Sequence, residues 1–106
     1  MIEPMTTASV KVSEVPPGGM RLLAVGDVRV ALCNVAGTFY AVEDLCTHDD
    51  GPLGEVTLRG DVVECPRHGA RFDVKTGRAV RMPAVVAVRT FPVRVEGDSV
   101  VVEVPA

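Results

Sequence analysis

Aromatic side chains are scarce in this sequence. Its 106 residues include no tryptophan, one tyrosine and three phenylalanines, although 47% of the residues are hydrophobic. A buried core must therefore consist mainly of aliphatic side chains, with valine the chief one. A chain of this length is expected to form one domain with a modest core.

Several classes of protein are disfavoured by features that the sequence lacks. The formal net charge is −3, so no basic stripe for nucleic acid is expected. Residues 1–5 do not pair a basic segment with a long apolar one, so we expect neither a signal peptide nor a membrane span. With no export signal and three cysteines, an odd number, a disulfide framework is not expected, and the cytoplasm is the expected location.

No long stretch repeats its apolar residues with a helical period, and the signals favour strands instead. Valine and threonine are common, and turn residues recur at short intervals. In residues 28–33 the alternation of apolar side chains predicts a strand with one buried face. Cys33, at the end of this run, is predicted to be a small buried apolar residue and not a redox thiol. Strands are expected over residues 8–12, 20–25, 27–35, 38–42, 55–58, 61–64, 85–88, 90–95 and 99–104.

Histidine is as scarce as tyrosine and phenylalanine, and it occurs only next to cysteine. The chain has two histidines, and both stand in short stretches that also hold two of the three cysteines. The first stretch contains Cys46 and His48, and the second contains Cys65 and His68. Thiolate and imidazole are the usual ligands of soft and borderline metals, so these four residues are the candidate metal ligands.

Three interpretations of the four residues compete. A structural zinc site commonly spaces its ligands as C-x2-4-C and H-x3-5-H, whereas here each stretch offers one cysteine and one histidine. A two-iron cluster of the Rieske type suits this arrangement, because two cysteines bind one iron and two histidines the other. A third interpretation is that the residues are unrelated core and surface positions, which the paired spacing and the use of every histidine disfavour.

The two stretches resemble the cluster-binding loops of Rieske ferredoxins, the small electron carriers of bacterial oxygenase systems. The resemblance extends over about residues 6–104. A weaker likeness, from Gly77 to Pro83 and Ala84, is to the proline-containing third loop that covers the cluster in that family. The matching residues are Cys46-Thr47-His48 with Gly51-Pro52-Leu53-Gly54, and Cys65-Pro66-Arg67-His68-Gly69 with Phe72-Asp73 and Gly77.

The resemblance implies a fold, a cofactor and a set of ligands. The fold class is all-β, a Rieske-like antiparallel β-sandwich or barrel with a small cluster-binding subdomain inserted at one end. The single domain of residues 1–106 would divide into this subdomain at about 43–83 and an outer sandwich at about 6–42 and 84–104. One [2Fe–2S] cluster would be bound per chain, by Cys46 and Cys65 as thiolates on one iron and by His48 and His68 as neutral imidazoles on the other. No catalytic residue is expected.

The implied function is that of a one-electron carrier and not an enzyme. Its partners would be a flavin-dependent ferredoxin reductase and the terminal oxygenase of an aromatic hydrocarbon catabolic system, and the chain would be a monomer. A runner-up is the small subunit of an assimilatory nitrite reductase, and an alternative of another class is a zinc-stabilised interaction module. A catalytic oxygenase subunit is excluded, because its mononuclear iron needs two further histidines and none remains.

Differences from the Rieske proteins of cytochrome complexes indicate a low reduction potential. Those proteins carry an extra cysteine in each loop, and serine and tyrosine hydroxyls near the cluster. The corresponding residues here are Gly51, Arg67, Ala70 and Phe72. Without hydrogen bonds to stabilise the reduced state, the potential is expected at the low end of the Rieske range, roughly −150 mV or somewhat above.

Charged residues of opposite sign gather around the two loops. They either keep the protein soluble or form a dipolar docking face for a redox partner. The acidic residues are Glu43, Asp44, Asp49, Asp50 and Glu55, and the basic residues are Arg67, Arg71, Lys75, Arg78 and Arg81.

Overall fold

The computed structural model describes residues 5–44, 58–64, 71–81 and 87–105 of the chain. These ranges contain eleven strands and one turn of 3-10 helix, η1 (Val12–Glu14), with no α-helix among them. Each strand pairing within them is antiparallel, so the predicted all-β class is confirmed. Within these ranges no helix has the length and apolar character that a membrane crossing requires.

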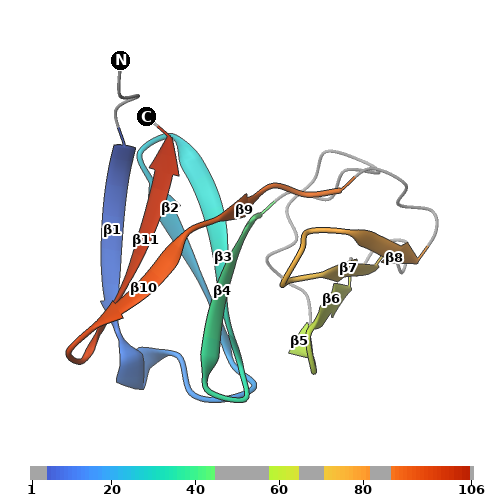
Figure 1. Cartoon of the computed structure of the whole chain (residues 1–106), viewed down its shortest axis with the longest axis horizontal. Coiled ribbons are helices and arrows are strands. Elements are labelled where there is room, and N and C mark those ends of the chain that lie inside the picture. Colours follow the sequence, from blue (N-terminus) through green and yellow to red (C-terminus); the bar gives the residue numbers. More distant parts are fainter. Residues whose placement is uncertain (1–4, 45–57, 65–70, 82–86, 106) are drawn as a thin grey trace.

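The strands form three sheets (Figure 1). The outer sheet consists of β1 (Met5–Lys11), β11 (Ser99–Pro105) and β10 (Val93–Glu96), in that order. The middle sheet consists of β2 (Met20–Val25), β3 (Val28–Val35), β4 (Thr38–Glu43) and β9 (Thr90–Phe91). The inserted sheet, which lies between β4 and β9 in the sequence, consists of β5 (Leu58–Arg59), β6 (Val62–Glu64), β7 (Arg71–Asp73) and β8 (Ala79–Arg81).

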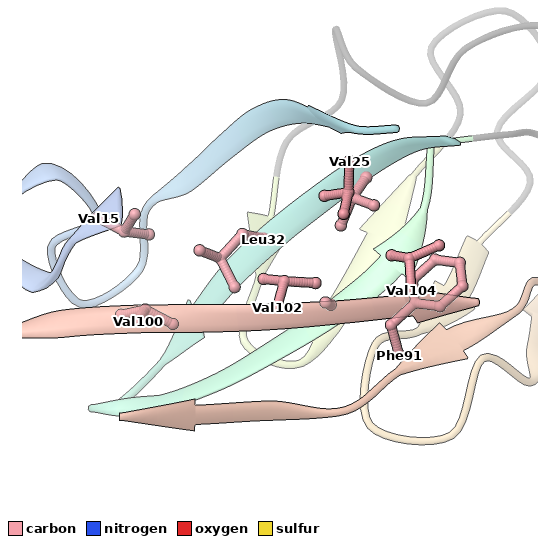
Figure 2. Packing of buried hydrophobic residues seen from close by; sticks show 9 residues of the cluster. Val15, Val25, Leu32, Phe91, Val100, Val102 and Val104 are labelled. Carbon is pink, nitrogen blue, oxygen red and sulfur yellow. The ribbon is translucent and has the colours of Figure 1, made fainter. Parts of the chain in front are cut away.

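The outer and middle sheets enclose the first core, which is almost entirely aliphatic. Leu32 on β3 packs in one cluster with Val100, Val102 and Val104 on β11, and Phe91 on β9 closes one side (Figure 2). The alternation along β11 sends every second residue, each of them a valine, into this core. Small branched side chains thus fill the core in place of aromatic ones, and they pack well on a pleated surface.

The opposite face of the middle sheet is also buried, and it forms a second core with the inserted sheet. Ala31 and Cys33 on β3 pack in a cluster that includes Val63 on β6 and Phe72 on β7. Their neighbours along β3, Val30 and Leu32, belong to the first core. The prediction of one buried face for residues 28–33 was therefore wrong, because β3 lies between two layers and is apolar on both sides.

Other strand predictions fared unevenly. The strand at 20–25 is confirmed as β2, and the strand at 27–35 starts one residue later, as β3. The single strand expected over 90–95 is wrong, because β9 pairs with β4 whereas β10, after Pro92, pairs with β11. Residues 87 and 88 are not in a strand, and residues 85 and 86 lie outside the described ranges. The strands β7 and β8 were not predicted.

Candidate metal centre

The four predicted ligands, Cys46, His48, Cys65 and His68, lie outside the described residues. Within the described ranges no group of three or more histidine, cysteine, aspartate or glutamate side chains could hold a metal ion. The structure instead describes the elements from which the two ligand stretches start and to which they return. Those elements decide whether the stretches can be held in fixed positions.

The second ligand stretch connects β6 to β7. Glu64 is the last residue of β6, Arg71 is the first of β7, and the two are paired in the strand register. Arg71 Nε donates a hydrogen bond to Glu64 Oε1 at 3.1 Å. The next registered pair, Val63 and Phe72, is fully buried in the second core. The connection of residues 65–70 therefore starts and ends on a strand pair that is fixed to the core.

The first ligand stretch follows β4, and two hydrogen bonds hold the chain where it leaves the middle sheet. The Glu43 N–H donates to Arg89 O and the Asp44 N–H donates to Arg29 O, each at 2.8 Å. The Arg89 guanidinium also donates to both Glu43 carboxylate oxygens at 3.2 Å, and its cation lies 5.2 Å from the centre of the Phe91 ring. The hydrogen bond to Glu43 raises the pKa of Arg89. The segments leaving and re-entering the middle sheet are thus joined to each other.

Two polar side chains are buried in the described ranges, and they differ in their hydrogen bonding. Asn34 Nδ2 donates to Val15 O and Asn34 Oδ1 accepts from the Gly37 N–H, both at 2.7 Å. Asp44, only 5% exposed, leaves its Oδ1 without a hydrogen-bond partner. Buried oxygens of this kind are usually satisfied by ordered water or a bound group. This oxygen lies two residues before Cys46 in the sequence.

The third stretch of the resemblance is held through Gly77, in the turn between β7 and β8. The Gly77 N–H donates to Asp73 O at 2.7 Å, and the Val88 N–H donates to Gly77 O at 2.9 Å. Gly77 has a φ of +77°, and a Cβ at this position would lie 2.1 Å from Val88 O. Pro83 and Ala84 lie outside the described residues, but the chain on either side of them is held by β8 and by Val88.

The third cysteine, Cys33, is confirmed as a packing residue. Its side chain is fully buried in the second core. Burial raises the pKa of its thiol to about 12, so a thiolate does not form there at neutral pH. The donors that remain for a metal are the two cysteines and two histidines of the ligand stretches.

Several residues of the predicted charged face have local partners. Arg71 pairs with Glu64 at 3.1 Å and Lys75 Nζ lies 3.6 Å from Asp61 Oδ2. Asp44 is buried, so its inclusion among exposed docking charges was wrong. The sequence analysis did not predict these pairs, because each joins residues from different strands or turns. The only signal was that the segment around Val63 contains the acidic residues of the pairs, and the segment around Phe72 contains the basic ones.

Comparison with known proteins identifies the family. The model of the Rieske [2Fe-2S] domain matches residues 6–92. The ferredoxin component of biphenyl 2,3-dioxygenase from Rhodococcus jostii is 46% identical over 90 residues, which cover 85% of this chain and 84% of that protein. The ferredoxin component of the naphthalene 1,2-dioxygenase system from Pseudomonas aeruginosa is 38% identical over 95 residues, with 90% and 91% covered.

Solved structures agree with the fold. The ferredoxin of carbazole 1,9a-dioxygenase from Nocardioides aromaticivorans superposes with a TM-score of 0.86 and is 29% identical, covering 92% of this chain and 96% of that one. A chain in a complex of reduced oxygenase and oxidized ferredoxin of carbazole 1,9a-dioxygenase has a TM-score of 0.81 and 41% identity, with 89% and 91% covered.

These similarities extend over nearly the whole length of small ferredoxins. By contrast, the chain covers only 29% of the terminal oxygenase of carbazole 1,9a-dioxygenase from Nocardioides aromaticivorans. The identity there is 22%, so this is a likeness of fold alone. The resemblance expected from the two ligand stretches is therefore confirmed, and so is the Rieske-type cluster as the cofactor. The donor set of two cysteines and two histidines fits that cofactor. The chain belongs to the Rieske [2Fe-2S] domain family, as one of its ferredoxins, which transfer electrons and are not themselves catalytic.

Proposed function

We propose that this protein carries single electrons from a flavin-dependent ferredoxin reductase to the terminal oxygenase of a ring-hydroxylating dioxygenase system. The observation that carries the proposal is the similarity to ferredoxin components of such systems over most of their own length. A structural neighbour was solved as a complex of oxygenase and ferredoxin. The substrate would be an aromatic hydrocarbon or aromatic acid, and the protein would act as a monomer in the cytoplasm, without nucleic acid or membrane.

The proposal assigns the cluster to four residues. Cys46 and Cys65 bind one iron as thiolates, and His48 and His68 bind the other as neutral imidazoles. When bound, the cluster supplies a one-electron couple whose potential is higher than that of an all-cysteine centre. The chain contributes rigid starting points for the ligands, since Cys65 directly follows the paired residue Glu64 and Cys46 comes three residues after Glu43, which binds Arg89. Side chains on a fixed hairpin hold a metal more accurately than a free loop does.

The proposal also divides the chain into an outer sandwich and a cluster-binding subdomain of about residues 43–83. Two features support the division. The inserted sheet lies in the sequence between β4 and β9, which are paired neighbours in the middle sheet, and the Glu43–Arg89 contact joins the two segments where the insertion starts and ends. Each ligand stretch then belongs to the same insertion.

Substitution of single cysteines tests the ligand assignment. We expect the purified protein to be brown-red, to contain acid-labile sulfide, and to give an electron paramagnetic resonance signal with a lower mean g-value than an all-thiolate cluster. Cys46→Ala and Cys65→Ala should lose the sulfide and the colour, whereas Cys33→Ala, the matched control at a buried non-ligand cysteine, should keep both. A colourless wild-type protein with stoichiometric zinc would refute the assignment.

Electron delivery is tested with the partners themselves. The reduced protein should be reoxidised in stopped-flow experiments when an aromatic-ring dioxygenase is added, and reduced again by a flavoprotein reductase and its nicotinamide donor. Reoxidation that is no faster with the oxygenase than without it would contradict the proposed role.

A further inference from the structure

The ion pair between Glu64 and Arg71 lies at the base of the second ligand stretch. The two residues are the last registered pair before residues 65–70, and Arg71 Nε is 3.1 Å from Glu64 Oε1. The pairing of β7 with β8 shifts register between Arg71 and Phe72. The strand pairing is therefore irregular at Arg71, the first described residue after the ligand stretch.

Because this pair lies next to a proposed ligand in the chain, its two charges affect how readily the cluster is reduced. Glu64 is bonded directly to Cys65, a proposed ligand. Reduction adds one negative charge to the group that Cys65 holds, and a carboxylate one residue away opposes it. A guanidinium bound to that carboxylate offsets the opposition. The two side chains are 27% and 36% exposed, so water screens them only in part.

We infer that Glu64 and Arg71 are positioning residues that together set the reduction equilibrium of the cluster. Their hydrogen-bonded pair joins the two strand ends that flank the second ligand stretch, and it holds opposite charges at the residue that precedes Cys65 in the chain and at its strand partner. The inference rests on the proposed function, because it requires a redox group at Cys65. It assigns to the pair an effect on the potential that a merely structural contact would not have.

The inserted sheet also contains a matched control pair. Lys75 and Asp61 are 3.6 Å apart, and Asp61 precedes β6 at the end of that strand opposite to Glu64. The length of β6 separates the control pair from the ligand stretch by roughly 10 Å more, at about 3.3 Å per strand residue. Their side chains are 46% and 44% exposed, so solvent screens them more.

Neutral variants of each partner test the inference in the holoprotein. The variants are Glu64→Gln, Arg71→Gln, the double variant, Arg71→Lys and the control pair Asp61→Asn with Lys75→Gln. Each is titrated by spectroelectrochemistry at low ionic strength. Arg71→Gln should shift the equilibrium toward the oxidised protein by roughly three- to tenfold, about 28 to 59 mV for one electron. Glu64→Gln should shift it the opposite way, and the double variant should return within about twofold of the wild type.

The remaining variants separate charge from shape. Arg71→Lys keeps the positive charge but loses the planar guanidinium. Its reduction potential should therefore stay close to that of the wild type, with most of the shift seen in Arg71→Gln absent. The control pair should leave the potential unchanged, and added salt should shrink the shifts of both single variants. If Arg71→Gln lowers the cluster content, the double variant should restore it, because it removes the carboxylate charge of residue 64 together with the guanidinium charge of residue 71.

Opposite results would overturn the inference. These are shifts of the same sign for Glu64→Gln and Arg71→Gln, no shift in either, or a double variant that restores neither potential nor cluster content. Such results in proteins that contain the cluster leave the proposed function standing. A wild-type protein that lacks acid-labile sulfide would refute the proposed function itself, so the two failures are distinguishable.

Discussion

Gly77 is expected to be the glycine in the inserted sheet that tolerates substitution least. Its φ of +77° is a left-handed conformation, and a Cβ there would lie 2.1 Å from the carbonyl oxygen of Val88. Real Cβ atoms essentially never approach an atom closer than 3.0 Å. In Gly77→Ala the segment that carries Val88 must therefore move away from the turn between β7 and β8, and it cannot do so by rotating a side chain, because the contact is with backbone.

The cost of Gly77→Ala can be estimated from two contributions. Placing a side chain in the left-handed region costs roughly 1–2 kcal/mol. Moving Val88 breaks the hydrogen bond from its N–H to Gly77 O, now 2.9 Å long, and the loss of one such bond costs about 0.5–1.5 kcal/mol. Val88 is also a member of the second core, so its displacement loosens packing. The free energy of unfolding should fall by about 2–4 kcal/mol.

Gly60→Ala is the matched control. Gly60 lies in the turn between β5 and β6 of the same sheet and has a φ of +63°, and no atom of the described residues lies within 4 Å of the place where a Cβ would be. It carries the conformational cost without the contact with Val88. Differential scanning calorimetry of the two holoproteins at one scan rate should place the Gly77→Ala midpoint at least about 4 °C below that of Gly60→Ala, the shift for each kcal/mol in a domain of this size. Equal midpoints would show that the Gly77–Val88 contact contributes nothing and would refute the reasoning.

Three further predictions concern the second core and the cofactor. Phe72 is fully buried between the middle and inserted sheets, so Phe72→Ala should lower the free energy of unfolding by about 3–5 kcal/mol in urea titrations; a loss below about 1 kcal/mol would contradict the assigned packing. Burial raises the pKa of Cys33 from 9.0 to about 12, so the unfolded chain loses this proton first. Stability should be unaffected by Cys33 below pH 9 and should decline between pH 9 and 12. The decline should be absent in Cys33→Ala, and identical pH profiles for the two proteins would exclude this cause. The reduction potential should lie near the low end of the Rieske range, roughly −150 mV, because Ala70 and Phe72 supply no hydroxyl donor. A redox titration with a midpoint well above zero would contradict this reasoning.

The strands that were predicted well are those with strong turn residues on both sides. β2 and β3 are joined at Gly26, which has a φ of +62°, and β3 and β4 are joined at Ala36 and Gly37, both also at positive φ. Such turns are visible in the sequence because few residue types accept that conformation. β7 and β8 have three residues each, which is too short for a periodic pattern. β6 is equally short, but it follows the turn at Gly60, which has a φ of +63°.

The division of the molecule into layers could not be derived from local patterns. Along β3 every residue from Val30 to Cys33 is buried, but alternate residues belong to different cores. An apolar run of this kind shows that a strand is buried on two sides without showing what covers each side. The change of sheet at Pro92 is similar, since a residue without an N–H is compatible with either a strand edge or a break.

The proposed metal ligands stand out in the sequence because their residue types are rare in this chain and lie close together in two short stretches. The supporting contacts do not. Glu64 and Arg71 become partners only through the register of β6 and β7, and Glu43 and Arg89 are 46 residues apart in the sequence. Neither pair has a sequence separation from which a contact can be predicted, so both pairs could be identified only in the three-dimensional structure.

Because β3 contributes side chains to both cores, the inserted segment cannot be transferred to another protein without it. An engineer who excised residues 43–83 to graft a Rieske centre onto a foreign scaffold would leave behind Ala31 and Cys33, and with them one wall of the core that contains Val63 and Phe72. The excised segment would expose the apolar side chains of this core to solvent, which promotes aggregation. A portable version of the centre must therefore bring β3 and β4 with it, or supply a substitute hairpin with small apolar residues at the same spacing.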